Sequence, residues 1–185
     1  MAISDTARSA AFRGLEIARG KGVTTSFDVN YRRKLWVRVE DAINVLSKAL
    51  NFVDIVFLDE DEASLLLGVS AIDDVFRELR SRFGIDRIVL KLGVKGSVAY
   101  WEGKIVKVNA FRVPVRDPIG AGDAYAGVFL ASILRGGHDV ESAMRRASAA
   151  AAMVVMVRGG DEENLPREDD LRRFLEGYGR QVDLR

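Results

Sequence analysis

Cysteine is absent from the 185 residues, histidine occurs once and proline occurs three times. The absence of cysteine excludes disulfide bonds, thiolate nucleophiles and cysteine-based zinc sites. The single histidine, His138, cannot supply a cluster of metal ligands, and any serine–histidine triad would have to use it. We expect His138 to lie at the surface of a turn, because two glycines precede it and an aspartate follows.

An excess of charge of one sign is also lacking, since 28 basic and 27 acidic residues leave a net charge of +1. This balance argues against a nucleic-acid-binding protein driven by bulk charge. No apolar run reaches the roughly 18 residues of a membrane span, and no signal peptide is visible at the N-terminus. The composition predicts one domain over 1–185 in a soluble cytoplasmic protein that binds neither nucleic acid nor membrane.

Apolar periodicity predicts helices alternating with short, nearly continuous apolar strands. The predicted helices are 4–19, 38–50, a short one from 59, 72–83, 120–137, 139–160 and 168–178; the predicted strands are 23–29, 52–58, 87–93, 97–101 and 105–111. This alternation is typical of a three-layer α/β/α fold with a mainly parallel sheet. Ligands bind at the carboxyl ends of such strands, which draws attention to the loops 30–36, 59–62, 93–96 and 117–123.

The segment DPIGAGDAYAG, residues 117–127, combines a glycine-lined turn with the start of an apolar helix. Free N–H groups at a helix start form an anion site, and glycines allow close backbone approach. Asp123, in the first turn, suits a general base beside a transferring phosphoryl group. A plain helix-stabilising role for Asp123 explains the spacing equally well. Tyr125 stands where a dinucleotide-binding motif needs its third glycine, and no Walker motif occurs.

This segment resembles the C-terminal signature of the PfkB (ribokinase-like) sugar kinases, close to D-x-x-G-A-G-D-x-[FY]-x-x-G. The resemblance implies that Asp123 is the catalytic base, that it also contacts the substrate, and that Gly120, Ala121 and Gly122 form the anion hole. It further marks Asp117 for a monovalent cation such as K⁺. Ile119 departs from the usual threonine or valine.

The segment IVLKLGVKGSVAYW, residues 88–101, resembles the strand–glycine loop–strand unit that lines the nucleotide in this family. The resemblance implies that ATP contacts Lys91, Leu92, Gly93, Val94, Lys95 and Gly96. Without the resemblance, a plain connection into a hairpin is the preferred interpretation.

The segment FDVNYRRKLW, residues 27–36, resembles a stretch of 2-keto-3-deoxygluconate kinases and some fructokinases. The resemblance implies that Arg32 faces a substrate carboxylate or a phosphate, that Asn30 contacts substrate, that Lys34 reaches the nucleotide phosphates, and that Asp28 orients the loop. A guanidinium fork suits such anions. The alternative is a solvated basic turn.

The segment LDEDEASLLLG, residues 58–68, is similar to the family's N-x-x-E region, with Asp59 in place of the asparagine. The resemblance implies that Glu62 organises Mg²⁺ indirectly, through water or phosphate. Acids at a helix start also have a simple dipole explanation, which stays open. In the C-terminal stretch that resembles the family's last helix and its glycine turn, Asp161 is expected to approach the substrate.

The resemblance covers nearly the whole sequence but only the C-terminal part of the family's fold, without counterparts of its N-terminal strands and lid. It implies a ribokinase-like kinase that uses ATP and Mg²⁺ on a sugar or sugar-acid hydroxyl, most like 2-keto-3-deoxygluconate kinase. A fructokinase or another ribokinase-family kinase is one alternative; a non-catalytic nucleotide-binding remnant or assembly partner is another. We expect feeble activity from this chain alone and a homo-oligomer that covers an exposed sheet edge or apolar patch.

Overall fold

The computed structural model describes residues 1–135, 137–158 and 165–182, and its contacts group into two compact units. Unit 1 comprises Met1–Leu92 and Val98–Ile105, and unit 2 comprises Gly93–Ser97 and Val106–Arg185. Whether the chain folds as a single domain stays a prediction. Within the described ranges, none of the helices combines the length and the apolar character that a membrane span requires.

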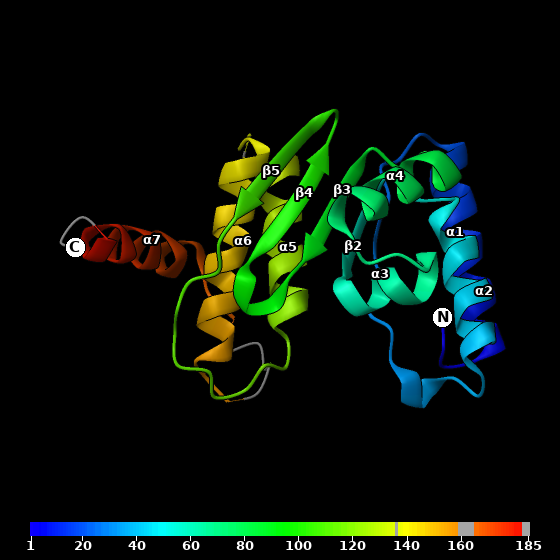
Figure 1. Ribbon diagram of the computed structural model, residues 1–185, viewed down its shortest axis with the longest axis horizontal. Coiled ribbons are helices and arrows are strands. Elements are labelled where there is room, and N and C mark those ends of the chain that lie inside the picture. Colours follow the sequence, from blue (N-terminus) through cyan, green and yellow to red (C-terminus); the bar gives the residue numbers. More distant parts are fainter. Residues whose placement is uncertain (136, 159–164, 183–185) are drawn as a thin grey trace. The chain divides into compact units, whose positions relative to one another are not determined.

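Five strands form one sheet in the order β1-β2-β3-β4-β5, as Figure 1 shows. They are β1 (Ser26–Asp28), β2 (Ile55–Asp59), β3 (Arg87–Lys91), β4 (Ser97–Trp101) and β5 (Lys104–Val108). The first three are parallel, with Asp28 opposite Phe57 and Asp59 opposite Lys91. β4 and β5 form the predicted hairpin, because Glu102 and Gly103 both take a positive φ in the two-residue turn between them.

The strand over 23–29 is shorter than predicted because its first residues bond to a loop. The Thr25 N–H donates to the Asp54 carboxylate at 2.7 Å, and the Thr25 hydroxyl donates to the carbonyl of Phe52 at 2.9 Å. The strand ladder therefore begins only at Ser26.

The helices of unit 1 are α1 (Asp5–Gly20), α2 (Val39–Leu50), α3 (Glu60–Leu67) and α4 (Ile72–Phe83). Their ends follow local chemistry: the Ser4 hydroxyl accepts from Ala7 N at the start of α1, and Gly84 ends α4 with φ +70°. The prediction of a helix over 72–83 is confirmed, and the one over 38–50 is confirmed to within a residue.

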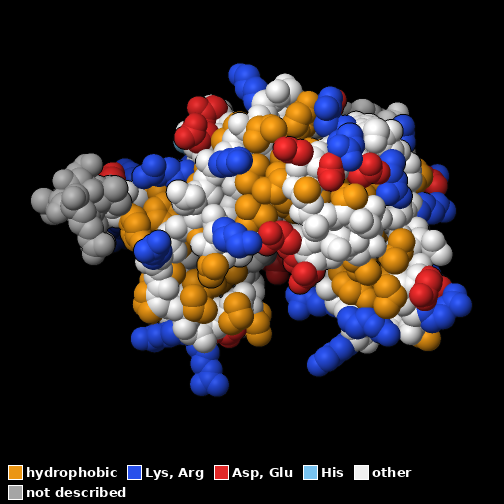
Figure 2. All heavy atoms as spheres, viewed as in Figure 1, with side chains coloured by type: hydrophobic (Ala, Val, Ile, Leu, Met, Phe, Trp, Pro, Cys, Tyr) orange, Lys and Arg blue, Asp and Glu red, His pale blue; other side chains and the backbone are white. Residues whose placement is uncertain are grey.

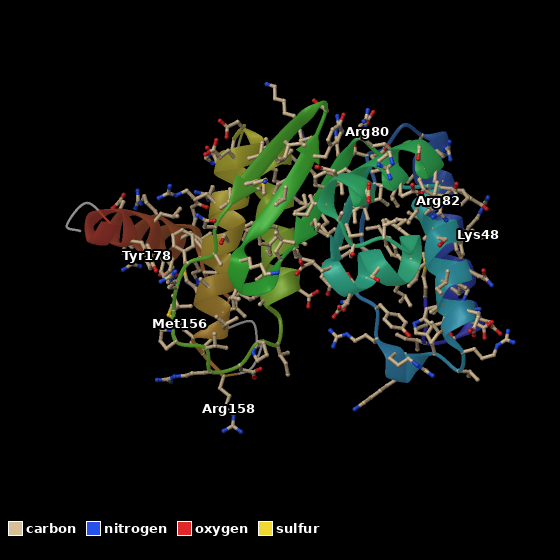
Figure 3. The ribbon with its side chains drawn as sticks, in the orientation of Figure 1. Lys48, Arg80, Arg82, Met156, Arg158 and Tyr178 are labelled. Atoms are coloured by element: carbon tan, nitrogen blue, oxygen red, sulfur yellow. The ribbon has the colours of Figure 1, made fainter. Side chains whose placement is uncertain are left out.

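The core of unit 1 forms where α2, α3 and α4 meet β2 and β3. Its fully buried side chains include Leu50, Val56, Leu58, Leu79 and Leu90. No residue of α1 is fully buried, but Leu15 packs against the core of unit 1. At the edge of this contact Phe12 lies against Phe52, and Lys48 (Figure 3) lies over the Phe12 ring at 4.9 Å.

Unit 2 is built on α5 (Ala121–Leu134), α6 (Val140–Val155) and α7 (Glu168–Val182). α5 and α6 pack closely because small residues line their contact, with Ala124, Ala149 and Ala150 in one buried cluster. α6 ends earlier than predicted, and the Val155 carbonyl accepts instead from the N–H groups of residues 116 and 117. α7 is tied down by the Tyr178 hydroxyl (Figure 3), which bonds to the backbone of Arg112.

Candidate active site

The turn before α5 is fixed by its own backbone and by one side chain. The Asp117 carboxylate accepts from Ile119 N at 3.0 Å, and the N–H groups of Arg116 and Asp117 donate to the Val155 carbonyl at 2.7 and 3.2 Å. Gly120 then takes φ +82° as the residue before the helix, which a side chain would disfavour. The turn therefore delivers the start of α5 in one defined orientation within unit 2.

The first turn of α5 presents unused hydrogen-bond donors. No described residue accepts a hydrogen bond from the N–H groups of Gly122 or Asp123, and Gly120 supplies no side-chain cap. The Ala121 N–H makes a long contact of 3.4 Å to the Pro118 carbonyl. Such groups, at the positive end of the helix dipole, attract an anion.

Asp123 is exposed beside these donors, and its carboxylate forms no ion pair with any residue in the described ranges. A free carboxylate next to unbonded N–H groups at a helix start is an arrangement suited to phosphoryl transfer to a hydroxyl. The turn leading to it is partly exposed too, with Ile119 at 66%. Over the face drawn in Figure 2, hydrophobic side chains lie at the surface among charges of both signs.

The glycine loop 93–96 lies in the same unit and contains a short 3₁₀ turn, Gly93–Lys95. Gly93 has φ +58° and Gly96 has φ +102°, and Val94 between them is 90% exposed. Gly96 packs against the backbone of 108–110, where a Cβ atom would lie 2.8 Å from Ala110 N. The loop therefore depends on glycine for its conformation and for its close approach to the segment after β5.

In unit 1, Lys91 and Asp28 form an ion pair at the carboxyl ends of β3 and β1. The Lys91 ammonium donates to both Asp28 oxygens at 2.9 Å, and the two side chains are only 20% and 19% exposed. This pair spans β2 and connects the two strand ends on either side of it. A contact of Lys91 with nucleotide stays a prediction.

In the loop after β1, Asn30 takes a positive φ of +42°, which is unfavourable for a residue other than glycine. Its side-chain oxygen accepts from Arg32 Nε at 3.0 Å, which orients the guanidinium. The terminal nitrogens of Arg32 bond to no described residue, and Arg32 is exposed. Lys34 is also exposed, in the 3₁₀ turn Arg33–Leu35.

Glu62 connects this loop to the start of α3. Its carboxylate accepts from Tyr31 N at 2.6 Å and from Asp59 N at 2.9 Å, while the Asp59 carboxylate accepts from Glu62 N at 2.8 Å in a capping box. Burial raises the pKa of Glu62, against the opposing effect of the two N–H donors.

The hydrogen bonds of Glu62 bear on whether its carboxylate can bind a metal ion. Both of its oxygens accept backbone N–H groups, which fixes the orientation of the carboxylate and leaves one lone pair on each oxygen. No group of three or more acidic or histidine side chains that could hold a metal occurs in the described ranges. The link from Glu62 to Tyr31, across 31 positions, is a role that the sequence pattern does not reveal.

The predicted site residues therefore fall into two sets, each described within its own unit. Unit 1 gathers Asp28, Asn30, Arg32, Glu62 and Lys91 at the carboxyl ends of β1–β3. Unit 2 holds the glycine loop and residues 117–123, and Asp161 lies outside the described residues. His138 is exposed, as expected.

One hydrogen bond in unit 2 joins two side chains that no sequence motif pairs. The hydroxyl groups of Ser97 and Tyr125 share a buried hydrogen bond of 2.7 Å. Tyr125 is part of the motif, but no local signal pairs it with a serine 28 positions earlier.

Comparison with known sequences finds a match over residues 2–167 to the profile described as "pfkB family carbohydrate kinase". A 2-dehydro-3-deoxygluconokinase from Thermoproteus tenax is 38% identical over 176 residues, covering 95% of this chain and 52% of that protein. A 5-dehydro-2-deoxygluconokinase from Clostridium perfringens is 32% identical over 183 residues, covering 95% and 54%. The chain thus spans about half the length of the curated relatives it matches.

Comparison with solved structures finds the same architecture. A ribokinase II structure from E. coli, in complex with ATP and Mg²⁺, superposes with a TM-score of 0.85 at 26% identity, covering 95% of this chain and 56% of that one. A fructokinase structure from Vibrio cholerae, bound to fructose, ADP and potassium, gives 0.83 at 25% identity, covering 94% and 57%. The expected ribokinase-like α/β fold is confirmed, over about half of each neighbour's length.

Proposed function

The chain belongs to the pfkB family of carbohydrate kinases, and we propose that it transfers a phosphoryl group from ATP to a hydroxyl of a sugar acid like 2-keto-3-deoxygluconate. The relative from Thermoproteus tenax, whose name states this substrate, supports the choice of sugar acid. The observation that carries the proposal is the start of α5, where unbonded N–H groups adjoin the exposed carboxylate of Asp123.

In the proposed reaction, the Asp123 carboxylate takes the proton of the attacking hydroxyl as the new oxygen–phosphorus bond forms. The bond from phosphorus to the bridging oxygen breaks, and that oxygen leaves with ADP. The N–H groups of Gly122 and Asp123, with those of Gly120 and Ala121 beside them, donate to the oxygens of the transferring group. The helix dipole adds to their effect because it points its positive end at the same place.

The residues of unit 1 are assigned to positioning and charge. Arg32, oriented by Asn30, offers its free terminal nitrogens to a substrate carboxylate or a phosphate. Lys34 and the 91–96 segment are proposed to bind the nucleotide, and Asp117 to bind a monovalent cation such as K⁺. When Mg²⁺ is bound with the nucleotide it neutralises phosphate charge. Glu62 is proposed to act on Mg²⁺ indirectly, through water or phosphate, and the two backbone N–H groups that hold its carboxylate support this role.

The test measures the release of ADP from ATP in the presence of 2-keto-3-deoxygluconate. It compares the purified wild-type chain with the Asp123→Asn and Glu141→Gln variants. Glu141 is the matched control, because it is an exposed acid in the first turn of α6 in the same unit. Loss of a general base lowers kcat by about 10²- to 10⁴-fold, whereas loss of a first-turn charge alone costs little. Equal and measurable rates in wild type and Asp123→Asn would refute the assignment.

A second candidate is nucleotide binding without turnover, because the glycine loop 93–96 and residues 117–123, both assigned to the nucleotide and its phosphate, lie together in unit 2. Saturable ATP or ADP binding with no product from any sugar or sugar acid would support it. Turnover of fructose in preference to the sugar acid would indicate the fructokinase alternative. A cytoplasmic location and self-association stay predictions.

A further inference from the structure

A buried hydrogen bond joins the two backbone segments of unit 2 that are assigned to the nucleotide. Ser97 Oγ and Tyr125 Oη lie 2.7 Å apart, and the residues are only 2% and 6% exposed. Ser97 directly follows the glycine loop 93–96, and Tyr125 lies two residues after Asp123 in α5. The bond thus connects the end of the loop to the helix turn that carries the anion site.

The surroundings of this bond restrict the loop at a second point. Gly96, next to Ser97, packs against the backbone of Val108 and Ala110, so its position cannot shift in that direction. Burial raises the pKa of Tyr125 to about 12, and the hydroxyl therefore keeps its proton at physiological pH. A neutral hydroxyl that is buried with a neutral partner contributes geometry, without charge that would repel phosphate.

We propose that the Tyr125 hydroxyl is a positioning group, which through Ser97 holds the 93–96 loop in register with the first turn of α5. A single nucleotide can then meet the loop and the helix start together without first ordering the loop. This inference rests on the proposed function, because it assumes that both segments contact nucleotide. The hydroxyl itself touches no reacting atom.

Comparing the stability and the nucleotide affinity of single and double variants distinguishes a positioning role from a purely stabilising one. Removing one hydroxyl of the pair leaves the other buried without its partner, which destabilises the fold. Removing both leaves two apolar groups, which is nearly neutral for stability. Loop positioning is lost in all three cases, so in the Ser97→Ala/Tyr125→Phe double variant stability recovers while nucleotide affinity does not.

The experiment measures the dissociation constant for ADP by calorimetry and the melting temperature of the purified full chain, for wild type, both single variants and the double variant. The control is Ser132→Ala, which removes a buried hydroxyl farther along α5, where it accepts from Arg146 Nε at 3.2 Å. We expect Kd to rise between about twofold and tenfold in all three Ser97 and Tyr125 variants, which is the worth of one hydrogen bond. Ser132→Ala lowers the melting temperature and leaves Kd unchanged.

The outcomes distinguish this inference from the proposed function. If the wild type binds ADP and Tyr125→Phe binds it with the same Kd, the inference alone is overturned. It is also overturned if Kd changes only in parallel with the melting temperature across all variants. No ADP binding by the wild-type chain overturns the proposed function and the inference with it. If Tyr125→Phe does not fold, Ser97→Ala breaks the same bond with a smaller change and decides the question.

Discussion

Replacement of Gly96 by alanine tests whether the glycine loop is held by backbone contact. Gly96 has φ +102°, where side chains cost about 1–3 kcal/mol of strain. An added Cβ atom would also lie well inside contact distance of the Val108 carbonyl and 2.8 Å from Ala110 N. Because both neighbours are backbone atoms, they cannot rotate away, and overpacking of this kind costs about a further 1–3 kcal/mol.

The matched control is Gly93→Ala, three residues earlier in the same loop. Gly93 also has a positive φ, +58°, but an added Cβ atom there meets nothing within 4 Å. It therefore costs only about 1–2 kcal/mol of left-handed strain. We expect Gly96→Ala to be less stable than Gly93→Ala by about 2–3 kcal/mol.

The measurement is urea or thermal unfolding of both variants, with ADP affinity alongside. For a chain of this size the difference corresponds to a melting temperature lower by roughly 5–10 °C in Gly96→Ala. Its ADP affinity should also fall more than that of Gly93→Ala, because the loop must move to make room. Equal stability of the two variants would show that the contact with 108–110 is not made in solution.

Two further predictions concern single hydrogen-bonded carboxylates. Glu62→Gln replaces one acceptor oxygen with an amide nitrogen, so hydrogen exchange should speed up about tenfold or more at the Tyr31 amide or the Asp59 amide, whichever loses its acceptor. Asp61→Asn, at an exposed neighbour, should change neither rate. Unchanged exchange at both amides in Glu62→Gln would contradict the hydrogen bonds of the Glu62 carboxylate. The Asp139 carboxylate caps α6 by accepting a hydrogen bond from the Ser142 N–H, and this bond lowers the pKa of Asp139 below 3.8. Its charged form is therefore favoured in the folded state, so the stability it contributes is present above pH 3.8 and is lost as pH falls through the folded-state pKa. Asp139→Asn keeps the cap without titrating, so wild type should lose stability relative to this variant in acid unfolding curves, and parallel curves would contradict the assignment.

Much of the fold could be predicted because helix and strand ends are set by neighbours in sequence. The α4 boundaries, the Ser4 cap and the turn at Gly84 follow from residues within a few positions of each other. The predicted ends that are wrong belong to helices and strands whose terminal residues bond to distant parts of the chain. α6 stops at Val155, whose carbonyl accepts from residues 116 and 117.

The sequence alone indicated the family and predicted an anion site at the α5 start, because the glycine turn and Asp123 are contiguous in the chain. Only the tertiary structure decided what the dispersed polar groups do. Glu62 accepts from Tyr31 N, Lys91 pairs with Asp28 across 63 positions, and Ser97 meets Tyr125 across 28. The physical reason is that such contacts depend on strand order and helix packing, which bring distant residues together and leave no periodicity in the sequence.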